Sequence, residues 1–126
     1  MIQSDLISYL LTNSSITVSA FYPSVAPTDP ATPFAVWSTN DNRSPFDGFD
    51  GVSELKEIDI QMDVFHADPS SASAYASEII AQLENFRGTM GSYYVDLIRV
   101  TSQQDGFENV TNLYFHSLLF TLTYRN

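Results

Sequence analysis

The chain has 126 residues, and its 15 acidic and five basic side chains give a formal charge of −10 at neutral pH. Nucleic-acid binders gain affinity from lysine and arginine, so this balance argues against tight binding of DNA. The chain lacks cysteine, which excludes disulfide bonds, thiol catalysis and cysteine-ligated zinc. With 44% hydrophobic residues, we expect one domain, residues 1–126, with a single core.

The N-terminal third is predicted to hold a short helix and an extended arm. Residues 2–12 place Ile2, Leu6, Tyr9 and Leu10 on one helical face. The stretch has no basic start and is too short for a membrane span, so we expect no signal peptide and synthesis in a cytoplasm. Residues 16–22 alternate as a short extended piece. Four prolines between positions 23 and 33 then exclude a helix and predict an irregular arm.

Residues 33–40 read as the first strand of a sheet, and a polar segment at 41–53 follows. This segment contains an internal echo, Phe46-Asp47-Gly48 and Phe49-Asp50-Gly51. Its composition predicts a long connection between two strands. Two large apolar rings are costly to expose, so Phe46 and Phe49 are expected either to fold back on the sheet or to dock into a partner.

The stretch from Glu54 to Gly91 predicts a strand followed by a helix that packs on it. Strict alternation puts one set of side chains on an apolar face, namely Ile58, Ile60, Met62 and Val64. Asp68 and Pro69 are suited to the N-cap and first position of the helix. Its apolar stripe comprises Ala72, Tyr75, Ala76, Ile79, Ile80 and Leu83. Arg87-Gly88 is the expected C-terminal cap.

The C-terminal part predicts two further strands. Residues 94–103 form one, and Asp105-Gly106 is a hairpin signal, with residues 107–112 making the connection longer than two residues. Residues 112–125 form a long strand that is apolar on both sides and therefore central. All five glycines fall in predicted turns. The expected fold is α+β, an antiparallel sheet of about four strands with two helices packed on it.

The motif-borne enzyme classes find no support in the sequence. It contains no phosphate-binding loop, dinucleotide fingerprint, zinc-protease helix or nucleophile elbow. His66 and His116 are the only imidazoles; they are read either as structural residues or as part of a metal or acid/base site, and we favour the first. No catalytic residue, metal or cofactor is assigned, and the protein is not expected to be an enzyme.

Three carboxylates, Glu57, Asp59 and Asp63, share the polar face of the central strand. Neighbours at i and i+2 stand about 7 Å apart. They are interpreted as a solvated face, as the acid pair of a hydrolase, or as a wall that must not adhere to DNA. The hydrolase needs one acid with a raised pKa in an apolar pocket, and nothing apolar flanks these acids on their own face before Phe65.

Short motifs follow one another along almost the whole chain. They are Phe21-Tyr22-Pro23, Thr32-Pro33-Phe34-Ala35-Val36-Trp37, Ile58-Asp59-Ile60-Gln61-Met62-Asp63-Val64-Phe65, Phe86-Arg87-Gly88-Thr89-Met90-Gly91, Ile98-Arg99-Val100, Asp105-Gly106-Phe107, Leu113-Tyr114-Phe115-His116 and Thr123-Tyr124-Arg125. In order and spacing, this series resembles a family of tail-completion proteins of tailed bacteriophages.

The resemblance implies a tail terminator, a virion protein of the tail or neck that is assembled in the host cytoplasm. Such subunits form a ring, expected here to be a homo-hexamer, on the head-proximal end of the tail tube. The ring stops tube growth and joins the tail to the head connector or stopper protein. DNA passes through it without specific binding, and no membrane is involved. The family implies no catalytic residues.

Combined with this resemblance, the charges suggest roles for two sets of residues. Glu57, Asp59 and Asp63 are predicted to face the lumen, because like charge lets the phosphates of DNA slide past. The segment 41–53 is predicted to project along the ring axis and to contact the tube or connector. The contact residues proposed there are Phe46, Asp47, Phe49 and Asp50.

Two alternatives remain open. The first is another neck subunit, an adaptor or a stopper. The second is a small acidic enzyme or ligand-binding domain that uses His66, His116 and a carboxylate. Solution mass discriminates between the classes, since a ring predicts a concentration-dependent oligomer and an enzyme predicts a compact small unit.

Overall fold

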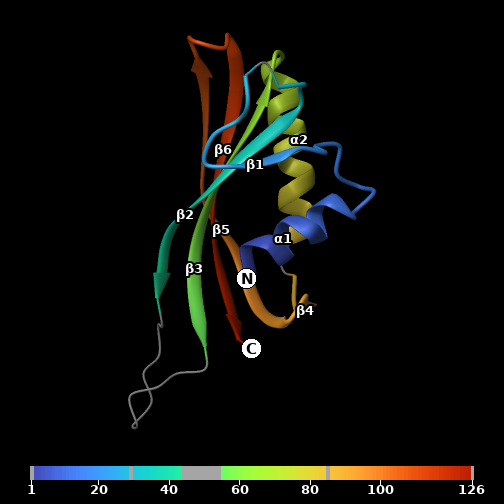
Figure 1. Ribbon diagram of the computed structural model, residues 1–126, viewed down its shortest axis with the longest axis vertical. Helices are drawn as coiled ribbons and strands as arrows, with labels where there is room; N and C mark the ends of the chain where they lie inside the picture. Colours follow the sequence, from blue (N-terminus) through green and yellow to red (C-terminus); the bar gives the residue numbers. More distant parts are fainter. Residues whose placement is uncertain (1, 29, 44–54, 85, 126) are drawn as a thin grey trace.

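The computed structural model describes residues 2–28, 30–43, 55–84 and 86–125, with no side-chain description for 41–43. Figure 1 shows an elongated sheet with two helices on one side. The elements, in chain order, are α1 (Ile2–Leu11), β1 (Phe21–Pro23), β2 (Phe34–Arg43), β3 (Lys56–His66), α2 (Pro69–Leu83), β4 (Gly88–Met90), β5 (Tyr93–Glu108) and β6 (Leu113–Arg125). The described strands form one sheet in the order β1-β2-β3-β6-β5-β4.

The expected fold class is wrong. The protein is mostly β, with a curled six-stranded mixed sheet that forms a half-barrel, rather than an antiparallel sheet of about four strands. Two edge strands of three residues each account for the difference in number. β1 runs parallel to β2 because the proline-rich arm carries the chain back across the sheet before β2 begins, so Phe21 lies beside Ala35.

The core lies between the two helices and the concave face of the sheet. The predicted apolar faces of the first helix, the central strand and the second helix are all confirmed by burial. Fully or almost fully buried side chains on these elements are Ile2, Leu6 and Leu10 of α1, Ile58, Ile60, Met62 and Val64 of β3, and Ala72, Ala76, Ile79 and Leu83 of α2. β6 adds Leu118, Phe120 and Leu122 from the same face. It pairs with β3 on one side and β5 on the other, which confirms its predicted central position.

The start of α2 follows the prediction, but its end does not. The carboxylate of Asp68 accepts hydrogen bonds from the Ser71 amide at 3.3 Å and the Ser71 hydroxyl at 2.8 Å, and Pro69 opens the helix. The helix ends at Leu83, because Glu84 turns to an extended conformation with ψ of 130°. Gly88 is therefore not its cap. Gly88 has a positive φ of 142° and is instead the first residue of β4, where it pairs with Val95 of β5.

The predicted Asp105-Gly106 hairpin is also misplaced. Both residues lie inside β5, paired with His116 and Phe115, and the chain turns only after Glu108. The turn closes at Asn112, whose φ of 56° is left-handed, a conformation that asparagine tolerates. The β5–β6 hairpin is therefore longer than predicted and forms one end of the molecule (Figure 1).

The first strand is also longer than the sequence suggested. β2 runs to Arg43, so the first three residues of the predicted 41–53 connection belong to the sheet. Among the described residues, no helix is long and apolar enough to span a lipid bilayer.

Candidate assembly surface

The three predicted lumen residues lie on the side of the sheet that carries no helix. We call this side the helix-free face; it comprises the odd-numbered residues of β3 and β6 with their cross-strand neighbours. Glu57, Asp59 and Asp63 are all half-buried there, while the even-numbered residues of β3 point into the core. The structure thus places the three acids on one face, as the alternation predicted. Their orientation toward the lumen of a ring stays a prediction.

Polar neighbours on β6 hold two of these acids. The Thr121 hydroxyl donates to Asp59 Oδ1 at 2.7 Å, and the Ser117 hydroxyl donates to Asp63 Oδ1 at 2.5 Å. The Gln61 side-chain amide donates to the same Asp63 oxygen at 3.4 Å. Both carboxylates are thus held by neutral hydroxyl or amide donors, whereas the acid of a hydrolase pair needs an apolar pocket. The surroundings of Asp59 and Asp63 suit an anionic surface.

An open groove of about 740 Å³ lies at the hairpin end of the helix-free face. Its walls are the described parts of the proline-rich arm, residues 24–28 and 30–32, and the turn between β5 and β6. The strands contribute six of its lining residues, namely Phe34, Val36, Asp63, Phe65, Glu108 and Leu113. Sequence reasoning singled out Asp63 but missed the groove, because its walls come from segments far apart in the chain. We call these six residues the acidic groove.

A row of aromatic rings runs across the sheet at the groove. Phe34 and Phe65 stack with centroids 5.0 Å apart and an interplanar angle of 10°. Tyr22 extends the row beyond Phe34, at 6.0 Å, and Phe115 extends it beyond Phe65, at 5.6 Å. Four strands contribute to this row. A fixed floor lowers the entropy lost when a partner docks.

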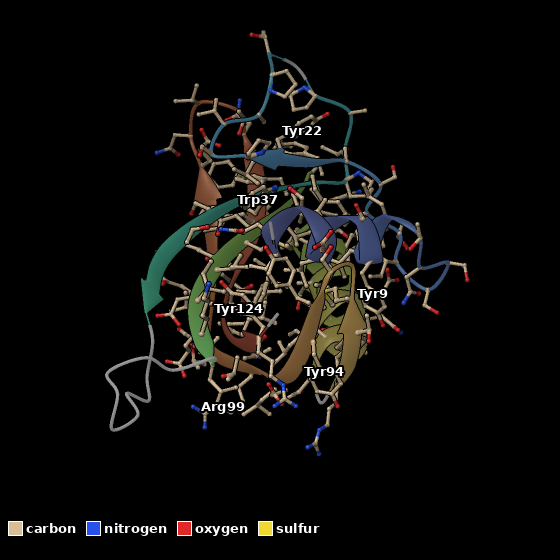
Figure 2. The ribbon with its side chains drawn as sticks, turned by 60° about the horizontal axis from the view of Figure 1, so that its bottom comes forward. Tyr9, Tyr22, Trp37, Tyr94, Arg99 and Tyr124 are labelled. Carbon is tan, nitrogen blue, oxygen red and sulfur yellow. The ribbon has the colours of Figure 1, made fainter. Side chains whose placement is uncertain are left out.

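All five basic residues of the chain lie at the other end of the sheet. Strand pairing puts Arg43 opposite Glu57, Lys56 opposite Tyr124, Arg99 opposite Thr121 and Arg125 opposite Tyr94. Arg87 immediately precedes β4 at the same end. Figure 2 shows Arg99 and Tyr94 at one end of the molecule and Tyr22 at the other. Among the described residues, the groove end carries only acids as charged side chains at neutral pH. The other end combines the bases with the acids Glu57, Asp59 and Asp96, so charge is distributed unevenly along the sheet.

Three residues form an exposed patch at the basic end of the helix-free face. Leu97 is 43% exposed and pairs with Thr123, and Arg99 is exposed on the same side of β5. The Arg125 guanidinium sits 5.0 Å from the Tyr94 ring centroid, and its Nη2 is 3.5 Å from Asp96 Oδ1. We call Leu97, Arg99 and Arg125 the basic patch.

The two histidines occupy separate environments. His116 is 8% exposed; its Nδ1 contacts the Asp105 carboxylate and its Nε2 lies 2.9 Å from Gln103 Oε1. His66 accepts a hydrogen bond from the Asp68 amide at 3.0 Å. Within the described residues, no cluster of three or more potential metal ligands occurs. The two imidazoles therefore contact different residues and do not form one site.

The predicted partner-contact residues Phe46, Asp47, Phe49 and Asp50 lie outside the described part of the chain. Their role as a contact with the tail tube or connector stays a prediction. The strand that leads toward them is described as far as Arg43.

Comparison with known proteins yields a structural neighbour. No protein-family profile matches the chain, and no curated protein matches its sequence. Its fold is similar to that of a chain in the solved structure titled "Virion of native gene transfer agent (GTA) particle". The TM-score is 0.75 at 15% sequence identity, and the match covers 99% of this chain and 95% of that one. At this identity the likeness establishes a shared fold.

Proposed function

We propose that this protein is a structural component of a phage-like virion rather than an enzyme. The observation that carries the proposal is its whole-length fold similarity to a chain of a gene transfer agent virion. The match covers 99% of this chain and 95% of the other, so little of either chain lies outside the shared fold. The motif series that resembles phage tail-completion proteins supports the same class independently of that comparison.

Within that class, we propose a tail terminator that forms a ring, expected to be a hexamer, at the head-proximal end of the tail tube. The ring would contact the tube protein on one side and the head connector or stopper on the other. Its electrical polarity along the sheet supports this role, because a neck protein needs different surfaces for different neighbours. The segment containing Phe46 and Phe49 remains the proposed axial contact.

A channel-wall role for Glu57, Asp59 and Asp63 is part of this proposal. Glu57 and Asp59 are half-buried acids on the helix-free face, and Asp59 accepts a hydrogen bond from Thr121. Charges near DNA act over about 8 Å at physiological salt, so only carboxylates close to the channel act on the phosphates. The sequence predicts the same role for Asp63, which also lines the acidic groove.

The experiment is to produce the parent particle without this chain. A terminator predicts filled heads separated from tails whose length is no longer controlled, and both defects are restored by supplying the wild-type protein. An adaptor or stopper predicts tails of normal length beside heads that lose their DNA. Particles that assemble and deliver DNA normally without the chain would contradict a structural role in the virion.

A further inference from the structure

We infer that the acidic groove of one copy binds the basic patch of a second copy of this chain. The inference rests on the polarity of the sheet and not on the position of the protein in a virion. It assigns residues to the contact between neighbouring subunits of the proposed ring. The two surfaces are at opposite ends of the same face, so each copy offers one of each.

The groove has the composition of a docking site for a cation flanked by an apolar side chain. Phe65, Val36 and Leu113 are half-buried, so part of each faces the groove. Two carboxylates line it, Asp63 and Glu108. Their described partners are the neutral donors Ser117, Gln61 and Thr111, and neither carboxylate forms an ion pair with any described residue. These two carboxylates, beside an apolar floor, can therefore form ion pairs with cations of another molecule.

The basic patch has the matching composition. Leu97 offers an exposed apolar side chain, and Arg99 forms no ion pair with any described residue. The Arg125 side chain remains 46% exposed beside Asp96. One aliphatic anchor between two arginines is complementary to an apolar floor with two carboxylates. Arginine suits such a contact because its planar fork can bind a carboxylate with two hydrogen bonds.

Charge selects a second copy as the occupant. A chain with a formal charge of −10 repels its own copies unless contacts are oriented. All five bases lie at one end, together with acids such as Glu57 and Asp59, and only acids carry charge among the described residues of the groove end, so one orientation brings unlike charges together. Electrostatic complementarity of this kind fixes register and disfavours wrong pairings more than it adds affinity.

The contact has two possible symmetries. Because groove and patch differ, successive copies can associate head to tail, and such contacts close into a ring when the rotation permits. Alternatively, two helix-free faces meet across a two-fold axis, and both contacts form in one dimer. In both cases Asp63 belongs to a contact between subunits. Only the head-to-tail case leaves Glu57 and Asp59 as candidates for the channel wall, because two facing helix-free faces would cover them.

Charge inversion tests the inference on the purified full chain. One variant carries Asp63→Lys and Glu108→Lys, and the other carries Arg99→Glu and Arg125→Glu. Circular dichroism confirms that each variant folds, and native mass spectrometry and light scattering follow association from low micromolar to millimolar protein at low salt. A matched control inverts Glu84 and Arg87, two exposed charges outside both surfaces.

The wild type is expected to associate, and added salt is expected to weaken this association. Each inverted variant alone should associate at least about tenfold more weakly. An equimolar mixture should regain association, because each variant then meets the opposite charge on the other. The control should behave as the wild type. A wild type that stays monomeric throughout, inverted variants that associate normally, or a mixture that gains nothing would each overturn the inference.

Failure here is distinguishable from failure of the proposed function. A dimer that recombines on mixing supports the groove contact and contradicts the ring. Conversely, inverted variants that lose only their binding to purified tail tubes would assign the groove to the tube protein, which overturns the self-contact and leaves the virion role standing.

Discussion

The ring of Phe115 on β6 lies across the backbone of Gly106 on β5, its cross-strand partner. A Cβ atom at position 106 would overlap the ring directly. The glycine therefore serves the packing of a neighbouring aromatic rather than a turn. This contact continues the aromatic row beneath the acidic groove to the next strand.

Gly106→Ala is expected to destabilise the protein by about 1–3 kcal/mol, the usual cost of forcing an extra carbon into a filled space. Urea unfolding measures the free energy. The matched background is Phe115→Leu, in which the same alanine should cost less because the ring is absent. An equal cost in both backgrounds would show that the ring is not the reason for the glycine.

Asp105→Ala is expected to lower the free energy of unfolding by about 1–3 kcal/mol, because it removes a partner from the buried His116 ring. The neighbouring Gln104→Ala is the control, since Gln104 is exposed and pairs with Ser117 on the other side of the strand. Urea unfolding compares the two. If both substitutions cost the same, the contact between Asp105 and His116 contributes nothing measurable.

Stability is expected to fall at alkaline pH partly through Tyr124. Burial, and next the nearby Tyr93, raise the pKa of its phenol above the ordinary 10.0. The unfolded phenol therefore loses its proton first, so this stabilisation is present below about pH 10 and is lost as the pH rises past it. Tyr124→Phe should flatten that part of the curve of unfolding free energy against pH. A curve with unchanged slope would contradict the assignment.

The channel-wall proposal predicts an effect on DNA passage without loss of assembly. Glu57→Lys with Asp59→Lys should give particles of normal composition that deliver less DNA, because the added cations hold phosphate. The control, Glu57→Gln with Asp59→Asn, removes charge without adding any and should deliver more than the lysine variant. Equal delivery by wild type and lysine variant would place these residues away from the DNA.

Periodicity predicted the parts of the fold that bury one face. The 3.6-residue spacing in α1 and α2 and the alternation in β3 depend only on local pattern, and the buried residues agree with it. The edge strands β1 and β4 have three residues each, which is too short for a periodic signal. Their existence depends on pairing with distant residues, so the number of strands and the mixed topology could not be read from the sequence.

The misassigned turns have a related cause. Asp-Gly is a frequent turn dipeptide, but Gly106 is in β5 because cross-strand packing with Phe115 outweighs local preference. The acidic groove was missed for the same reason: the arm, β3 and the hairpin approach only in three dimensions. The sequence does place Phe65 and Phe115 near the ends of two strands. That the two rings are neighbours follows only once the register of β3 and β6 is known.

The most direct measurement for the proposed function is a cryo-electron microscopy reconstruction of the parent particle that resolves its neck. The expected result is a closed ring of copies of this fold between the tail tube and the head connector, with Glu57 and Asp59 toward the DNA channel. Copies at the distal tip or on the capsid surface, or none in the particle, would contradict the tail-terminator proposal.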